Sequence, residues 1–138
     1  MRVLFFAFAL AFSATQAFSQ PLPQKVAAAK LLLQSYGYQI LDTKSCDLTK
    51  GQMCYFDRLF YSSNQYIVVA VVEDGVYDLD MYAYDSAGYM YQQDETFGDV
   101  AAIVFDKYIN DRLTVYVKNV NCYNRAYSYD INIIVAYK

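Results

Sequence analysis

The chain contains no histidine and no tryptophan, and only 18% of its 138 residues are charged. Histidine is the base of Ser-His-Asp and Cys-His catalytic sites and a usual zinc ligand, so its absence excludes those sites. A hydrophobic content of 57% excludes a disordered chain. An isoelectric point near 4.7 argues against nucleic-acid binding, which requires a basic face. The length fits one ordinary domain.

The first 19 residues have the pattern of a secretory signal peptide. Arg2 supplies a positive charge, residues 3–12 are an unbroken apolar run, and a small, polar stretch follows. Ala17 and Ser19 satisfy the small-residue rule, which predicts cleavage after Ser19. A membrane anchor is the alternative, but a span needs roughly 20 apolar residues. The mature chain is expected to begin at Gln20, to lack a membrane span and to be secreted or periplasmic.

Three cysteines in an oxidising compartment predict one disulfide and one free thiol, with three possible pairings. Cys46 and Cys54 flank a short segment in which Lys50-Gly51 is typical of a turn, and this local loop favours their pairing. Cys122 lies among asparagines. We therefore expect Cys122 in a loop, as a spare thiol or a contact to another chain.

Residues 24–35 predict a helix of about three turns, because they are rich in Ala, Leu, Lys and Gln. Pro23 precedes this segment and Gly37 follows it as a stop signal. The apolar face of the helix, which should pack against the rest of the chain, consists of Val26, Ala29, Leu32, Leu33 and Tyr36.

From Tyr38 onward the hydrophobic period changes to two, and residues 66–72 are apolar throughout, as in a central strand buried on both faces. The predicted strands are residues 38–41, 53–61, 66–72, 76–84, 89–93, 100–105, 112–118 and 127–137. This pattern predicts a mainly β chain, an antiparallel, jelly-roll-like β-sandwich of about eight strands over residues 38–138. One N-terminal helix lies within residues 20–37. The alternative is an α+β fold with the helix on a single curved antiparallel sheet.

Alternation within these strands also predicts the core. Apolar side chains at every second position should be buried between layers, because successive strand residues point to opposite faces. The residues expected there are Ile67, Val69, Leu79, Met81, Ile103, Phe105, Val115, Val117, Ile131 and Ile133.

Residues 76–88 resemble the signature strand of bacterial pre-peptidase C-terminal domains, roughly D-x-D-L-x-L-x-D-x-x-G. The matching positions are Asp78, Asp80, Met81 in place of Leu, Asp85 and Gly88. Later apolar strands fit the same pattern, so the similarity covers about residues 60–138. The start of the strand near residues 110–113 departs from the family's Gly-Thr-Tyr-like pattern, and the helix and cysteines are not family features. The resemblance implies a small, non-catalytic β-sandwich that accompanies secreted hydrolases, and some relatives bind calcium or matrix proteins.

The acids are unevenly distributed, with ten carboxylates and one base between Glu73 and Asp111. Asp78 and Asp80 leave the same face of a strand that Asp85 ends, and calcium takes 6–8 oxygen ligands. However, no D-x-D-x-D-G loop appears, and alternating acids are also ordinary on a solvated strand. Calcium at Asp78, Asp80 and Asp85 is therefore a hypothesis, and no other cofactor is expected.

The chain has 16 tyrosines, whose rings can stack on sugars or anchor protein contacts. Tyr82, Tyr84, Tyr89 and Tyr91 are predicted to lie on the polar side of one hairpin, which makes them the candidate ligand-binding surface. The competing interpretation is β-propensity alone, since tyrosine suits a half-buried pleated surface. Carbohydrate-binding sandwiches usually rely on tryptophan, which this chain lacks.

Three functions follow from these observations. The first is a secreted, non-catalytic β-sandwich that binds a protein or glycan or assists an extracellular or envelope complex. The second is a secreted inhibitor or stabilising subunit of a hydrolase, acting through an exposed loop. The third, a small hydrolase with two carboxylates about 5–10 Å apart across a cleft, is supported least, because so small a domain has little room for a cleft. We therefore expect no enzyme activity.

Overall fold

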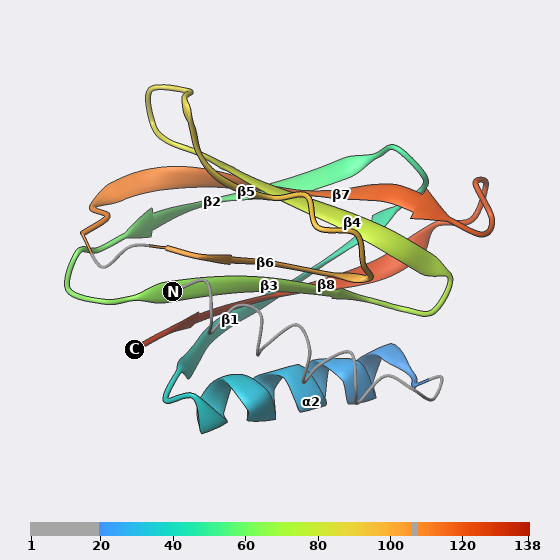
Figure 1. The fold of residues 1–138 in the computed structure, drawn as a ribbon, viewed down its shortest axis with the longest axis horizontal. Coiled ribbons are helices and arrows are strands. Elements are labelled where there is room, and N and C mark those ends of the chain that lie inside the picture. The colour runs from blue at the N-terminus through green and yellow to red at the C-terminus, as the bar shows by residue number, and fades with distance from the viewer. Residues whose placement is uncertain (1–19, 106–107) are drawn as a thin grey trace.

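The computed structural model describes residues 20–105 and 108–138. The predicted signal peptide and its cleavage site after Ser19 lie outside the described residues. The described chain forms one helix followed by eight strands (Figure 1). These elements are α2 (Leu22–Ser35), β1 (Gln39–Leu48), β2 (Met53–Phe60), β3 (Tyr66–Val72), β4 (Val76–Tyr84), β5 (Met90–Asp94), β6 (Val100–Val104), β7 (Asp111–Cys122) and β8 (Tyr129–Tyr137).

The strands form two four-stranded antiparallel sheets that face each other. Sheet A has the order β1-β8-β3-β6 and sheet B has the order β2-β7-β4-β5. Each sheet alternates strands from the two halves of the chain, which is the connectivity of a double-sheet jelly roll. The predicted mainly β sandwich is confirmed, and the alternative of a helix on a single curved sheet is wrong.

The space between the sheets holds the main hydrophobic core. Phe60 of sheet B meets Phe105 at the end of β6, with ring centroids 5.0 Å apart. All ten predicted core residues are buried. Eight of them lie between the sheets, whereas Ile67 and Val69 point to the other side of β3, beneath the helix. Both faces of strand β3 are therefore buried, which explains why the strand is apolar throughout.

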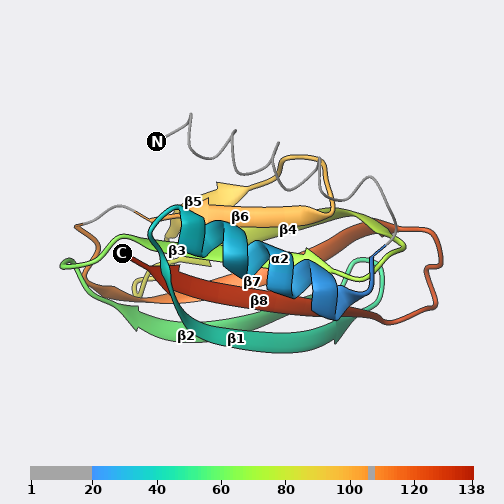
Figure 2. The same cartoon turned by 90° about the horizontal axis from the view of Figure 1, so that it is seen from below.

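Helix α2 covers the outer face of sheet A (Figure 2). Ala29 and Leu33, two residues of the predicted apolar face, are buried in a second cluster with Val69 of β3 and Ile134 of β8. The Nζ of Lys25, a residue only 3% exposed, donates to the carbonyl of Val72 and to the carboxylate of Asp74. These bonds fix the first turns of the helix over the β3–β4 turn. None of the helices within the described residues is long and apolar enough to cross a bilayer.

One disulfide joins the edges of the two sheets. It pairs Cys46 of β1 with Cys54 of β2, as predicted. On the opposite side, Asp94 at the end of β5 is buried, and its carboxylate accepts hydrogen bonds from the backbone N–H groups of Thr96 and Ala102. The two open sides of the sandwich are therefore joined differently, by a covalent bond at β1–β2 and by a carboxylate between β5 and β6.

The predicted loop position of Cys122 is wrong. Strand β7 continues beyond Lys118 to Cys122, and its last residues pair with the start of β4 through two register shifts. Cys122 is buried as a free thiol. Pairing with β4 outweighs the turn preference of Asn119 and Asn121, because strand formation depends strongly on tertiary context.

Candidate functional site

The outer face of sheet B is not covered by the helix of the described chain, which lies on sheet A (Figure 1). It carries an open groove of about 720 Å³ that crosses β2, β7 and β4 and reaches the β4–β5 hairpin. The residues that line it are Met53, Asp57, Tyr82, Tyr84, Asp85, Ser86, Gly88, Arg112, Thr114, Tyr116 and Lys118. These side chains point outward because every second residue of each strand faces away from the core.

Tyrosines form a row across three neighbouring strands of this face. Tyr55 of β2, Tyr116 of β7 and Tyr82 of β4 are direct register partners across the sheet. The ring centroids of Tyr55 and Tyr116 are 5.5 Å apart, and Tyr84 meets Tyr116 edge-on at 5.6 Å. We call Tyr55, Tyr116, Tyr82 and Tyr84 the tyrosine row. Cross-strand neighbours fix these rings, while Tyr55 remains 65% exposed and open to a ligand.

Hydrogen bonds hold Tyr82 in place within the row. Its hydroxyl lies 2.9 Å from a carboxylate oxygen of Asp80 and 3.0 Å from one of Glu95, and it can donate to only one of them at a time. Desolvation raises the pKa of Tyr82, and the two acceptor carboxylates raise it further. Desolvation also raises the pKa of Asp80, opposed by the Tyr82 hydrogen bond and aided by the nearby carboxylates. Tyr82 is therefore a neutral, oriented donor at physiological pH.

Charged side chains surround the aromatic rings. The carboxylate of Asp57 accepts a 2.6 Å hydrogen bond from the hydroxyl of Thr114. Arg112 lies at the start of β7 and Lys118 lies beyond its middle, and neither forms an ion pair within the described part of the chain. Such residues can donate hydrogen bonds to a ligand in the groove, while the tyrosine rings offer apolar contact area.

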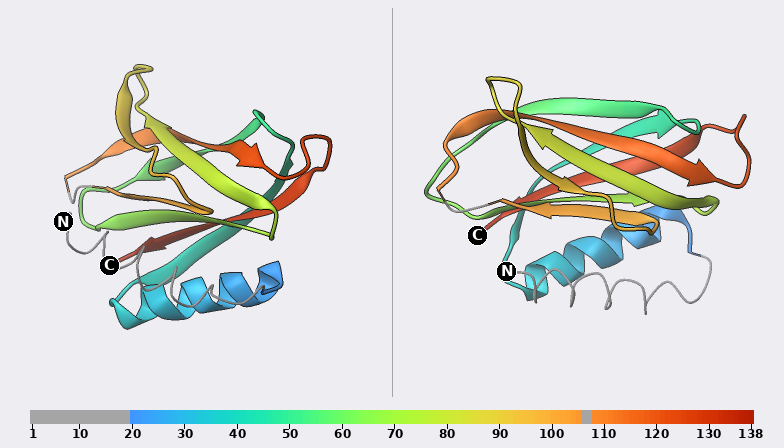
Figure 3. Two further views of the ribbon diagram at one scale, coloured as in Figure 1. Left: turned by 45° about the vertical axis from the view of Figure 1, so that its right-hand side comes forward. Right: turned by 45° about the horizontal axis from the view of Figure 1, so that its top comes forward.

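The β4–β5 hairpin projects from the sandwich beside the groove (Figure 3). At its turn, Gly88 adopts a φ of 85°, which favours glycine. The exposed residues of the turn include Tyr89, whose side chain is 72% exposed. The hairpin therefore forms one wall of the groove and also presents its own tip to solvent.

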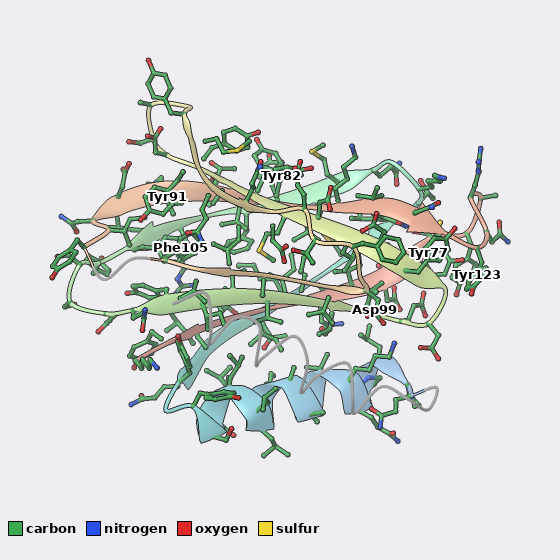
Figure 4. The ribbon with its side chains drawn as sticks, viewed as in Figure 1. Tyr77, Tyr82, Tyr91, Asp99, Phe105 and Tyr123 are labelled. Carbon is green, nitrogen blue, oxygen red and sulfur yellow. A yellow bond between two sulfur atoms is a disulfide. The ribbon has the colours of Figure 1, made fainter. Side chains whose placement is uncertain are left out.

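The structure divides the four predicted surface tyrosines into three groups. Tyr82 and Tyr84 belong to the tyrosine row and Tyr89 lies at the hairpin turn. Tyr91 instead packs against Phe105, with ring centroids 5.8 Å apart, at the edge of the core (Figure 4). The prediction that Tyr91 shares a face with the other three tyrosines was wrong. A register shift in the β4–β5 pair leaves Tyr91 without a partner on β4. Such a one-residue bulge reverses the face that a side chain occupies.

Sequence reasoning missed the tyrosines that complete the row. Tyr55 and Tyr116 lie on the outward positions of β2 and β7, beside inward Phe56 and Val115. The period-two pattern places both residues on the polar side of their strands. Only the strand order, which the pattern does not contain, brings them next to Tyr82.

The structure does not bring the three proposed calcium ligands together. Asp80 lies in β4 and Asp85 follows its last residue, five positions further along, which is about 16 Å in an extended strand. One carboxylate oxygen of Asp85 accepts hydrogen bonds from the backbone of its own turn. No group of three or more Asp, Glu, Cys or His residues is close enough to hold a metal within the described ranges. The calcium site at Asp78, Asp80 and Asp85 is not supported by this arrangement.

A second aromatic cluster lies at the end of the sandwich away from Tyr91 and Phe105 (Figure 4). Tyr77 at the start of β4 contacts Tyr123 of the β7–β8 loop and Phe97 of the β5–β6 loop, with centroids 5.2 and 6.4 Å apart. Tyr123 and Phe97 are strongly exposed. This cluster is separate from the groove and provides an exposed tyrosine for comparison.

Comparisons with known proteins bear on the fold. Neither the models of known protein families nor the sequences of curated proteins match the chain. Among solved structures, the chain is similar to PliG of Aeromonas hydrophila, a periplasmic inhibitor of g-type lysozyme. That match has 6% identity and a TM-score of 0.50, and it covers 70% of this chain and 85% of PliG.

The chain is also similar to the pre-peptidase C-terminal domain of a collagenase from Bacillus anthracis. This match has 12% identity and a TM-score of 0.52, and it covers 68% of this chain and 87% of that domain. Such identities carry information on the fold alone. The predicted resemblance is confirmed at that level, and the sandwich has a fold like that of the pre-peptidase C-terminal domain.

Proposed function

We propose that the chain is an exported, non-catalytic β-sandwich that binds a glycan along the outer face of sheet B. The observation that carries this proposal is the tyrosine row, in which Tyr55, Tyr116 and Tyr82 lie side by side on a surface that no other described helix or strand covers. The Cys46–Cys54 disulfide supports an extracellular or periplasmic location, because disulfides persist in oxidising compartments.

A glycan fits the chemistry of the groove. Sugar rings present flat apolar faces that stack on aromatic rings, and their hydroxyls need both donors and acceptors. The tyrosine row supplies the rings, Arg112 and Lys118 supply donors, and the free carboxylate oxygen of Asp57 and the hydroxyl oxygen of Thr114 supply acceptors. Several adjacent tyrosines offer the contact area that tryptophan provides in other sandwiches. A protein ligand would use similar residues, so the experiment must separate the two.

The groove carboxylates support binding rather than catalysis. Asp57 accepts a hydrogen bond from Thr114, and Asp85 accepts two from the backbone of its turn. Glycoside hydrolysis needs one carboxyl group as an acid and a second as a base or nucleophile across the scissile bond. Both groove carboxylates are instead engaged in holding local structure.

A glycan array with matched variants tests this proposal. We expect the wild-type chain to bind a defined set of glycans and the Tyr116→Ser variant to bind them about tenfold or more weakly, as for loss of a central aromatic contact. Tyr123→Ser, which changes an exposed tyrosine outside the groove, should bind normally. Failure of the folded wild-type chain to bind any glycan, or equal binding by the Tyr116 variant, would contradict the proposal.

The second candidate function is inhibition of a hydrolase through an exposed loop. The projecting β4–β5 hairpin favours it, and PliG, a fold neighbour, is by its name a lysozyme inhibitor. Its test is the rate at which a g-type lysozyme clears a peptidoglycan suspension with and without the chain. A concentration-dependent fall in that rate is expected, and an unchanged rate at a large molar excess of the chain would exclude this function for that enzyme class.

A further inference from the structure

The tip of the β4–β5 hairpin, residues 85–89, is held by several hydrogen bonds. One carboxylate oxygen of Asp85 accepts from the backbone N–H groups of Ala87 and Tyr89, at 3.0 and 2.9 Å. The N–H of Asp85 donates to the carbonyl of Tyr89, and the N–H of Gly88 donates to the carbonyl of Asp85. The turn is therefore closed by both backbone and side-chain bonds.

A second carboxylate ties this tip to the body of sheet B. Asp111, the first residue of β7, accepts hydrogen bonds through one oxygen from the hydroxyl and the backbone N–H of Ser86, at 3.0 and 3.3 Å. These two bonds lower the pKa of Asp111, so the carboxylate is ionised at neutral pH. Charge-assisted hydrogen bonds of this kind are stronger than neutral ones. The hairpin tip is thus fixed relative to the groove.

The same tip presents a side chain that its own fold does not use. The Tyr89 side chain is 72% exposed, and within the described residues neither a ring contact nor a side-chain hydrogen bond holds it. Tyr123 is more exposed still, but its ring rests on Tyr77. Six bonds therefore order a backbone whose most prominent side chain is free to contact a partner.

We infer that the hairpin tip is a preorganised docking element that enters the substrate cleft of a glycan hydrolase, with Tyr89 as its anchor. This inference rests on the second candidate function and names its contact. A projecting tip matches a concave cleft, and a tyrosine ring offers a flat apolar face with a hydroxyl at its edge, as a sugar ring does. An ordered tip binds with little loss of backbone entropy. Asp111 is a positioning residue, since it acts on the partner only through Ser86.

The test uses the same lysozyme clearance assay with variants of the folded chain. Tyr89→Ala should raise the inhibition constant about 30-fold, the loss expected for an aromatic anchor. Asp111→Ala should also weaken inhibition, whereas Asp111→Asn, which keeps an acceptor for Ser86, should restore most of it. Tyr123→Ala, at the opposite end of β4 and outside the groove, should inhibit as the wild type does. Equal unfolding temperatures exclude misfolding as the cause.

The possible outcomes separate this inference from the functions on which it is built. Inhibition that persists in Tyr89→Ala overturns the hairpin as docking element while the inhibitor function stands. Lack of inhibition by the wild-type chain overturns both the inhibitor function and the hairpin as docking element for g-type lysozymes. Inhibition that depends on Tyr89 supports the inference even if the glycan array shows no binding, because Tyr89 does not belong to the tyrosine row.

Discussion

The two sheets of the sandwich differ in what covers their outer faces. Sheet A lies beneath helix α2, and its strand β3 is buried on both sides. Nothing in residues 20–105 or 108–138 forms such a layer over sheet B, and its strands β4 and β7 alternate between core residues and outward polar or tyrosine residues. The residue pattern of a strand thus indicates how many of its faces are covered. An uninterrupted apolar run indicates two buried faces, and alternation of apolar and polar residues indicates one. The uncovered face is the one available to a ligand.

Truncation of single side chains in helix α2 should show how much of the free energy of unfolding depends on the covered face of sheet A. Leu33→Ala removes a fully buried side chain between α2 and sheet A and should cost about 2–5 kcal/mol in free energy of unfolding, measured with denaturant. Leu31→Ala, in the same helix but 68% exposed, should change it by less than about 0.5 kcal/mol. Equal effects of both substitutions would mean that the helix is not a core layer.

Opening the disulfide tests whether the two sheets unfold as one unit. The Cys46–Cys54 bridge closes a loop of sequence separation 8, for which chain-entropy arguments give about 2.5 kcal/mol. A Cys46→Ser/Cys54→Ser variant should lose about this much and still unfold in one transition by circular dichroism and tyrosine fluorescence. A reductant should destabilise the wild type but leave the stability of the double variant unchanged, because the variant has no disulfide to reduce. Two separate transitions would contradict a shared core.

The polar anchor of the helix is expected to contribute less than its apolar face. Lys25→Met keeps the buried stem but leaves the carbonyl of Val72 without its donor, which should cost about 1–3 kcal/mol. Asp74, which is half exposed, can return to water. Lys30→Met on the same helix is the control. A Lys25 variant as stable as the wild type would show that packing alone positions α2.

The smallest expected effect concerns the edge of sheet A near Leu48, where Asp47 and Asp130 lie directly opposite each other on β1 and β8. A hydrogen bond between the two carboxyl groups raises the pKa of Asp130 above its ordinary 3.8, with desolvation and repulsion from Asp47 and Glu73 adding to the shift. The folded state therefore holds this proton more tightly, and stability falls as the pH rises from about 3.8 through the raised pKa.

Asp47→Asn should remove that loss and stabilise the chain at pH 7 by about 0.2–1 kcal/mol, the range for facing like charges. Unfolding measured as a function of pH supplies its own control, because below the ordinary carboxyl pKa the difference should disappear. A variant that is less stable than the wild type at pH 7 would show that the facing carboxyl groups do not repel.

Sequence reasoning identified the sandwich, the helix and the disulfide because each depends on local pattern. The apolar run of β3 and the alternation of β4 both correspond to observed strands. It failed where a strand partner decides the outcome. The register shift at Tyr91 reversed that residue's face, and pairing with β4 extended β7 to Cys122. The tyrosine row could not be predicted, since it depends on strand order across the sheet.

The position of β8 affects how the chain can fold. The last strand of the sequence lies inside sheet A, where it pairs with β1 on one side and β3 on the other. Sheet A therefore remains incomplete until residues 129–137 have been synthesised. Such long-range pairings also fold slowly compared with local contacts. During synthesis the apolar strand β3 lacks its β8 partner, so we expect the nascent chain to need protection from aggregation until residues 129–137 have emerged.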